Sequence, residues 1–206
     1  HGHHHDQGIA ALLRYLRHFP SMWRSPVNDA VVAELAPNDH ERVADIGAGM
    51  GAGVVPAAKT GAMVTAIDPT NYMRAILNVR RMWQRARKRI EVVDGSAEQI
   101  PIEDGAFDAV MAVNALHHFA DVDAAAVEVF RVMAPGGRLV FVDEQFHDPA
   151  HPEYAAMDPD HEHIFDTAEL ADVMSSLTAA GFEAIDGELL KIDGRPSLRF
   201  AARRPR

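Results

Sequence analysis

Three side chains suited to proton chemistry, Asp143, Glu144 and His147, follow the apolar run "GRLVFV" directly or within a few residues. A histidine pair, His117 and His118 in "LHHF", follows another apolar run. Histidine can take up a proton near neutral pH and so suits a general base. We expect His147, His118 and Glu144 to be the catalytic candidates, although the histidine pair could also do no more than shape a pocket.

The same acid cluster could hold a magnesium ion. Oxygen-rich clusters bind Mg²⁺, and a bound Mg²⁺ lowers the pKa of a hydroxyl group that it holds. However, no D-x-D or His-x-His spacing reinforces that interpretation. We therefore favour carboxylates at a pocket rim that orient a substrate, and we assign no metal ligand.

A glycine-rich stretch, "VADIGAGMGAG" (Val43–Gly53), lies within and directly after an apolar segment. Gly47, Gly49 and Gly51 would let the backbone turn sharply and approach a ligand where a Cβ would collide. The spacing also fits G-x-G-x-x-G/A when Ala52 is the last position, so a nicotinamide dinucleotide stays open as the ligand.

An acid ends the next apolar run, "MVTAID": Asp68 lies 23 positions after Asp45. A carboxylate at such a strand end can accept hydrogen bonds from both hydroxyls of a ribose. The glycine turn and this acid together predict an adenosine-type ligand without choosing among the cofactors that contain one.

The elements that must position these residues alternate along the chain from residue 42 onward, apolar strand after amphipathic helix. Such alternation predicts an α/β fold, a doubly wound, mostly parallel seven-stranded sheet with helices on both faces. Its ligand site lies beyond the carboxyl ends of the strands. We expect strands at 42–47, 63–68, 89–94, 107–113, 137–144, 182–190 and 197–204, and helices at 52–59, 71–86, 122–133 and 167–181.

A single domain is expected over residues 9–206. Within it, residues 9–41 form a helical cap of two helices, Ile9–Phe19 and a second one that opens with Ser25 as N-cap and Pro26 in the first turn. Residues 147–166 contain three prolines and little periodicity, which indicates a long loop or lid. Residues 1–8, a His-rich tail that is either a tag remnant or native, are left out of the fold.

The amino-acid composition excludes or disfavours several classes of function. The 206 residues include no cysteine, which excludes disulfides and thiol catalysis. A formal net charge of −10 disfavours nucleic acid as a partner, because binding to phosphates depends on Lys and Arg. No apolar stretch approaches the roughly 20 residues of a membrane span. We expect a cytoplasmic protein with a small-molecule acceptor, which could form a homodimer through its N-terminal helices.

Basic residues concentrate in "RRMWQRARKR" (Arg80–Arg89). Apolar residues recur at helical spacing on another face: Met73, Ile76, Val79 and Trp83. This pattern predicts an amphipathic helix. We favour a solvated basic side over a patch that binds an anionic ligand.

The downstream segments "DGSAEQIPIEDGAFDAVMAVNALHHF" and "VFRVMAPGGRLVFVDE" extend the pattern of the glycine turn and "AIDP". Together these four blocks, from about Val43 to Glu144, resemble the class I S-adenosylmethionine-dependent methyltransferases, in the group close to the ubiquinone and menaquinone methyltransferases. The resemblance implies a Rossmann-like methyltransferase fold and S-adenosylmethionine as the cofactor.

The resemblance also implies roles for single residues. Asp45 and the turn of Gly47, Gly49 and Gly51 would face the methionine part of the cofactor. Asp68 would bind its ribose.

Further residues would surround the adenine and the methionine amine. Pro69 or Met73 in "DPTNYM" would lie against the adenine ring. Ser96 and Ala97 belong to "SAE", which stands where the family usually has "DAE", so Ser96 replaces an acid. The backbone of Asn114 would meet the methionine amine.

The expected function is methyl transfer from S-adenosylmethionine to a small molecule, with a hydroxyl of a metabolite, sugar or lipid-linked ring as the expected acceptor. "NALH" at the end of the fourth strand differs from the N-P-P-aromatic motif of nucleobase methyltransferases. Two alternatives stay open: an NAD(P)-dependent oxidoreductase, although the chain has no Y-x-x-x-K, and a non-catalytic methyltransferase-like binding protein.

Overall fold

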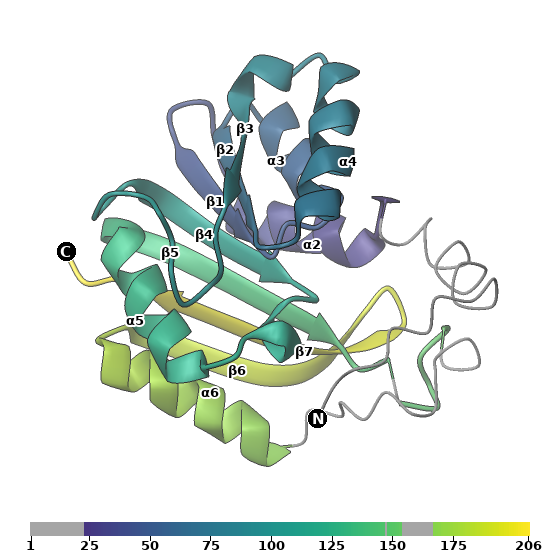
Figure 1. Cartoon of the computed structure of the whole chain (residues 1–206). Coiled ribbons are helices and arrows are strands. Elements are labelled where there is room, and N and C mark those ends of the chain that lie inside the picture. Colours follow the sequence, from purple (N-terminus) through teal and green to yellow (C-terminus); the bar gives the residue numbers. More distant parts are fainter. Residues whose placement is uncertain (1–22, 147, 154–166) are drawn as a thin grey trace, which may run out of the picture.

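The computed structural model describes residues 23–146, 148–153 and 167–206. Their centre is a seven-stranded sheet in the order β3-β2-β1-β4-β5-β7-β6 (Figure 1). The strands are β1 (Arg42–Ile46), β2 (Met63–Asp68), β3 (Ile90–Asp94), β4 (Phe107–Val113), β5 (Met133–Glu144), β6 (Glu183–Ile192) and β7 (Arg195–Arg203). The helices are α2 (Pro26–Leu35), α3 (Val54–Lys59), α4 (Asn71–Met82), α5 (Val122–Val132) and α6 (Thr167–Ala180), with short 3-10 turns η1 (Arg87–Arg89) and η2 (Leu116–His118).

The first five strands run parallel, and β7 pairs antiparallel with both β5 and β6. A tight hairpin joins β6 to β7, and its two central residues, Asp193 and Gly194, have φ of 50° and 76°. Positive φ at both positions is what a two-residue hairpin turn of type I′ requires. The predicted doubly wound, mostly parallel seven-stranded sheet is confirmed.

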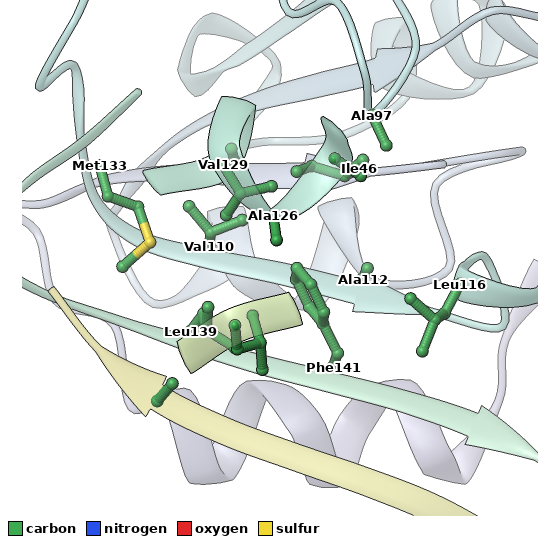
Figure 2. Close-up of a cluster of buried hydrophobic side chains, with 14 of the residues drawn as sticks. Ile46, Ala97, Val110, Ala112, Leu116, Ala126, Val129, Met133, Leu139 and Phe141 are labelled. Carbon is green, nitrogen blue, oxygen red and sulfur yellow. The ribbon is translucent and has the colours of Figure 1, made fainter. Parts of the chain in front are cut away.

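Helices cover both faces of the sheet, because side chains alternate between the faces along each strand. On β1, Val43 joins the apolar cluster beneath α2, α3 and α4, whereas Ala44 and Ile46 join the cluster beneath α5 and α6. Figure 2 shows the second cluster. The sheet is therefore buried on both sides.

The second predicted N-terminal helix is α2, and it begins as expected. Ser25 is the N-cap, its Oγ accepts a hydrogen bond from the Val27 N–H at 3.2 Å, and Pro26 follows in the first turn. This satisfies one of the N–H groups that have no partner within a helix. The predicted helix Ile9–Phe19, the tail 1–8, His147 and residues 154–166 of the predicted loop lie outside the described residues.

Two boundaries differ from the prediction by four residues, and the others by two residues or fewer. The helix after β2 ends at Met82 and not near residue 86, because the N–H groups of Trp83 and Gln84 bond to carbonyls three residues back, which tightens the last turn. Strand β5 begins at Met133, four residues before the predicted start, because a bulge interrupts its pairing with β4 between Phe107 and Ala109. Among the described residues, no helix has both the length and the apolar character to cross a membrane.

Candidate functional site

A cavity of about 560 Å³ opens at the carboxyl ends of the central strands. It lies where the strand order reverses between β1 and β4, the usual ligand position in doubly wound folds. Its volume is in the range of small-molecule and cofactor sites, roughly 300 to 1,000 Å³. Nine of the ten residues predicted to bind the cofactor line it: Asp45, Gly47, Gly49, Asp68, Pro69, Met73, Ser96, Ala97 and Asn114.

The floor of the cavity is the turn after β1. The N–H groups of Gly47 and Ala48 donate to the carbonyl of Ile67 at 2.9 and 3.1 Å, which ties the turn to β2. Gly47 has φ of 68°, and a Cβ there would collide with Ala115. Gly49 has φ of 50° and open space where a side chain would stand. A ligand can therefore approach the backbone closely at Gly49.

Gly51 serves the fold in a different way from the other two glycines. It is buried and is not among the residues that line the cavity. Its φ is 83°, and a Cβ there would collide with the fully buried side chain of Leu77 in α4. Gly51 thus lets α4 pack closely against the turn.

Two acids face the cavity from neighbouring strand ends. Asp68 is 6% exposed, and its carboxylate accepts from the N–H groups of Gly49 and Thr70, each at 2.8 Å. Asp45 is 3% exposed, and within the described part of the chain no donor bonds to its carboxylate. Burial and, second, the nearby charge of Asp68 raise the pKa of Asp45 to about 8. A cationic ligand in the cavity would offset the repulsion between the two carboxylates and favour the ionised form of Asp45.

Loops complete the side of the cavity where adenine is expected. Pro69 and Met73 follow β2, and Ser96 and Ala97 follow β3. Glu98 holds the latter loop in place, because its Oε1 accepts from the N–H groups of Ala120 and Asp121 at 2.7 and 3.4 Å. Burial raises the pKa of Glu98, but these and other hydrogen bonds outweigh it and leave the pKa lowered. Glu98 is therefore an anchored, ionised acid at the cavity.

The histidine pair after β4 divides into two environments. Successive residues of a 3-10 turn point about 120° apart, and His117 lies against the buried Asp143 while His118 is exposed. His117 Nδ1 is 2.7 Å from Asp143 Oδ1, and Asp143 Oδ2 accepts from the Leu116 N–H at 3.0 Å. Both histidines line the cavity. Sequence reasoning selected His118 and missed the pairing, since no spacing signal connects residue 117 to residue 143.

Burial of Asp143, which is 1% exposed, raises the pKa of this carboxyl, and the hydrogen bond with His117 opposes that shift. The imidazole thus compensates a carboxylate that would otherwise be costly to bury. The arrangement fixes the ring of His117 and makes Nδ1 the nitrogen that faces the acid.

Glu144 lines the cavity as the centre of a buried polar network. Its carboxylate receives hydrogen bonds from Asn114 Nδ2 at 2.7 Å, His151 Nε2 at 3.0 Å and Arg195 Nη1 at 3.1 Å. His151 Nδ1 accepts from the Glu153 N–H at 3.0 Å, so Nε2 is the nitrogen that carries the proton in neutral His151. Because three donors hold its carboxylate, Glu144 is suited to forming a fixed part of the cavity wall rather than to transferring a proton.

Asn114 connects this wall to β4. Its own Oδ1 accepts from the Glu144 N–H at 2.8 Å, and its φ is 54°, a conformation that asparagine tolerates better than most residues. His147, the third predicted catalytic residue, lies outside the described residues. Within the residues that are described, no group of three acids or histidines could hold a metal ion.

Comparison with known proteins finds similarity to methyltransferases over the part of the chain that contains the glycine turn and Asp68. Residues 44–141 match the methyltransferase domain family. A demethylmenaquinone methyltransferase of Clavibacter sepedonicus is 33% identical over 131 residues, which is 64% of this chain and 50% of that protein. The ubiquinone/menaquinone biosynthesis C-methyltransferase UbiE of Brucella anthropi is 30% identical over 120 residues, 56% of this chain and 46% of that protein. The chain spans about half the length of the curated relatives it matches.

Solved structures share the fold at low sequence identity. A putative S-adenosyl-L-methionine-dependent methyltransferase of Methanococcus maripaludis has a TM-score of 0.75 at 16% identity, over 100% of this chain and 98% of that one. The [4+2]-cyclase SpnF has a TM-score of 0.72 at 21% identity, over 87% of this chain and 80% of that one. Because a cyclase has the same fold, the fold alone does not fix the reaction.

Proposed function

Because the chain belongs to the class I S-adenosylmethionine-dependent methyltransferases, in the group near the ubiquinone and menaquinone methyltransferases, we propose that it methylates a small molecule bound beside His117. The observation that carries this proposal is the pair of buried acids, Asp45 and Asp68, at one end of the cavity.

The two acids fit the cofactor in different ways. Asp45 has no described hydrogen-bond donor, and its carboxylate suits the ammonium group of the methionine part. Each oxygen of Asp68 already accepts one backbone N–H and has a second lone pair, so a ribose hydroxyl can still donate to each. A dinucleotide offers a negatively charged pyrophosphate and no ammonium group for Asp45, which disfavours the oxidoreductase alternative.

The remaining cavity residues take the roles that follow from their positions. Gly49 leaves room for the methionine part beside the backbone, and Gly47 and Asn114 border it. Pro69 and Met73 offer apolar contact to the adenine ring. Ser96 and Ala97 close the same side, with the Ser96 hydroxyl as an acceptor for the adenine amino group.

When bound, S-adenosylmethionine supplies a methyl group on a sulfonium; an electron pair of the acceptor forms the new bond to carbon, and the pair of the broken C–S bond returns to sulfur. His117 takes the proton from the acceptor hydroxyl at Nε2, the ring nitrogen on the far side from Asp143. Asp143 holds the ring and stabilises the imidazolium that forms. Glu144, held by its three hydrogen-bond donors, orients the acceptor.

Two outcomes are open for the acceptor. The His117–Asp143 pair favours O-methylation of a hydroxyl on a metabolite, sugar or lipid-linked ring. The name of the Brucella anthropi relative, a C-methyltransferase, favours C-methylation as a second candidate, and for it we propose a hydroxylated ring as the acceptor. Both begin with removal of the ring hydroxyl's proton, so His117 has the same role in each.

Incubation of the full chain with S-adenosylmethionine carrying a labelled methyl group, and with a panel of hydroxylated rings and sugars, tests the proposal. We expect label in at least one acceptor, with one S-adenosylhomocysteine formed for each methyl transferred. Nuclear magnetic resonance of the product separates an O-methyl from a C-methyl group. Failure with every acceptor, despite tight S-adenosylhomocysteine binding, would favour the non-catalytic alternative.

The base is tested by the substitution His117→Gln. We expect kcat to fall by about 10²- to 10⁴-fold, the usual contribution of a general base, while the Kd for S-adenosylhomocysteine changes little. Asp143→Asn should lower kcat less, since the imidazole remains. His118→Gln is the neighbouring comparison, and a larger loss at His118 than at His117 would contradict the assignment.

A further inference from the structure

Helix α4 and the residue that caps its C-terminus, Trp83, carry an apolar stripe that faces solvent. Tyr72, Val79, Met82 and Trp83 are 58%, 64%, 65% and 85% exposed. With 3.6 residues per turn these positions fall on one side of the helix, opposite the buried Leu77. We call these four residues the α4 stripe. In Figure 1, α4 lies at the outside of the molecule, on the face of the sheet opposite to α5 and α6.

A group of cations directly follows the stripe. Arg85, Arg87, Lys88 and Arg89 are all exposed. None of the four forms an ion pair with a carboxylate in the described part of the chain. Residues 71–89 contain no acidic residue, although the whole chain has a formal net charge of −10. The positive charge of the turn is therefore not offset by an acidic residue within 71–89. We call these four residues the basic turn.

We propose that the α4 stripe and the basic turn dock on the surface of an anionic lipid bilayer. An exposed helix face that combines tryptophan and aliphatic side chains with adjoining Arg and Lys is the pattern of interfacial membrane binding. The apolar side chains enter the boundary between headgroups and acyl chains, and the cations meet the anionic headgroups. Charge complementarity thus selects the membrane among the surfaces that an apolar stripe could cover.

A second copy of the chain fits this surface less well. In an isologous dimer, the same patch faces itself. Residues 71–89 of the second copy would bring no acidic residue to the basic turn. An anionic bilayer instead offers apolar acyl chains to the α4 stripe and anionic headgroups to the basic turn.

The stripe is also continuous with the cavity. Tyr72 begins the stripe and lines the cavity, as does its neighbour Met73. Docking through α4 would therefore bring one rim of the cavity close to the bilayer surface. The proposal does not depend on the proposed methyl transfer, because binding to lipid is measured without acceptor or cofactor.

Co-sedimentation of the full chain with vesicles tests the proposal, with phosphatidylcholine alone compared with phosphatidylcholine containing 30% phosphatidylglycerol. We expect at least tenfold stronger partitioning to the anionic vesicles. Raising the salt from 0.1 to 0.5 M should weaken this binding, because salt screens charges outside the bilayer. No binding to anionic vesicles, or equal binding to neutral ones, would overturn the proposal.

Paired variants separate this surface from the rest of the molecule. Val79→Ser with Trp83→Ser should reduce partitioning at least tenfold, and Arg87→Gln with Lys88→Gln should remove most of the salt dependence. Val127→Ser, at a 59% exposed position on α5, is the matched control and should bind as the unaltered chain does. Circular dichroism verifies that each variant is folded. A change of molecular mass in sedimentation equilibrium on altering the stripe, with vesicle binding unchanged, would assign the stripe to a second copy instead.

Discussion

Burial and a neighbouring carboxylate disfavour the ionised form of Asp45. Asp45 is 3% exposed and lies near a second carboxylate, so burial and then the charge of Asp68 raise its pKa to about 8, from an ordinary value of 3.8. Between these two values the folded chain holds a proton at Asp45 that the unfolded chain releases. The free energy of unfolding therefore decreases as the pH rises through this window.

The substitution Asp45→Asn removes this dependence, because the amide resembles the protonated acid in shape and does not ionise. We expect the variant to gain stability relative to the unaltered chain by up to about 1.4 kcal/mol for each pH unit between pH 5 and 8. Urea denaturation at several pH values measures the difference. Parallel pH profiles for the two proteins would contradict the raised pKa.

At the residue scale, the sequence predicted those cavity residues that belong to short local motifs. Asp45, Gly47, Gly49 and Asp68 occur at strand ends with recognisable spacing, and all four line the cavity. The partner of His117 could not be predicted, because Asp143 is 26 residues away and the pairing depends on the direction of one 3-10 turn.

The network of Glu144 escaped prediction for the same reason. One of its donors, Arg195, lies 51 residues away and reaches the site only because β7 pairs with β5. Sequence reasoning gave Glu144 a catalytic role, which stays untested. The three donors now favour a role in orientation.

At the element scale, the turn after β1 joins two functions, ligand access at Gly49 and helix packing at Gly51. Gly51→Ala should destabilise the fold, since it combines strain at φ of 83° with a collision against Leu77. Gly194→Ala is a matched control, because φ there is 76° and nothing lies within 4 Å of the added Cβ.

We expect the control to cost about 1 to 2 kcal/mol from the left-handed conformation alone. Gly51→Ala should cost roughly 1 to 3 kcal/mol more, the usual effect of overpacking a core. Urea denaturation of both variants measures the two values. Equal losses would mean that α4 moves aside without cost.

Element boundaries were less predictable than element types. The strands were recognisable as apolar runs between helices, but "APGG" in residues 134–137 resembles a turn, and its place inside β5 depends on a bulge opposite β4. Similarly, the basic stretch after α4 resembles the end of a longer helix. Pairing and packing between distant residues, rather than local propensity, set both ends.

At the scale of the whole molecule, the topology explains why the site forms where it does. The strand order reverses between β1 and β4, which opens the cavity above the glycine turn and sets Asp45 and Asp68 on its wall. Sequence alternation was sufficient to predict the mostly parallel sheet. It could not predict that α4 leaves an apolar stripe in solvent, since exposure is a property of the assembled fold.

The most direct test of the central claim is isothermal titration of the full chain with S-adenosylhomocysteine, with a nicotinamide dinucleotide as the comparison. We predict binding of S-adenosylhomocysteine and a loss of about 1 to 3 kcal/mol in the substitution Asp68→Ala, the cost of leaving ribose hydroxyls without their acceptor. No binding at millimolar S-adenosylhomocysteine, together with tighter binding of the dinucleotide, would contradict the account.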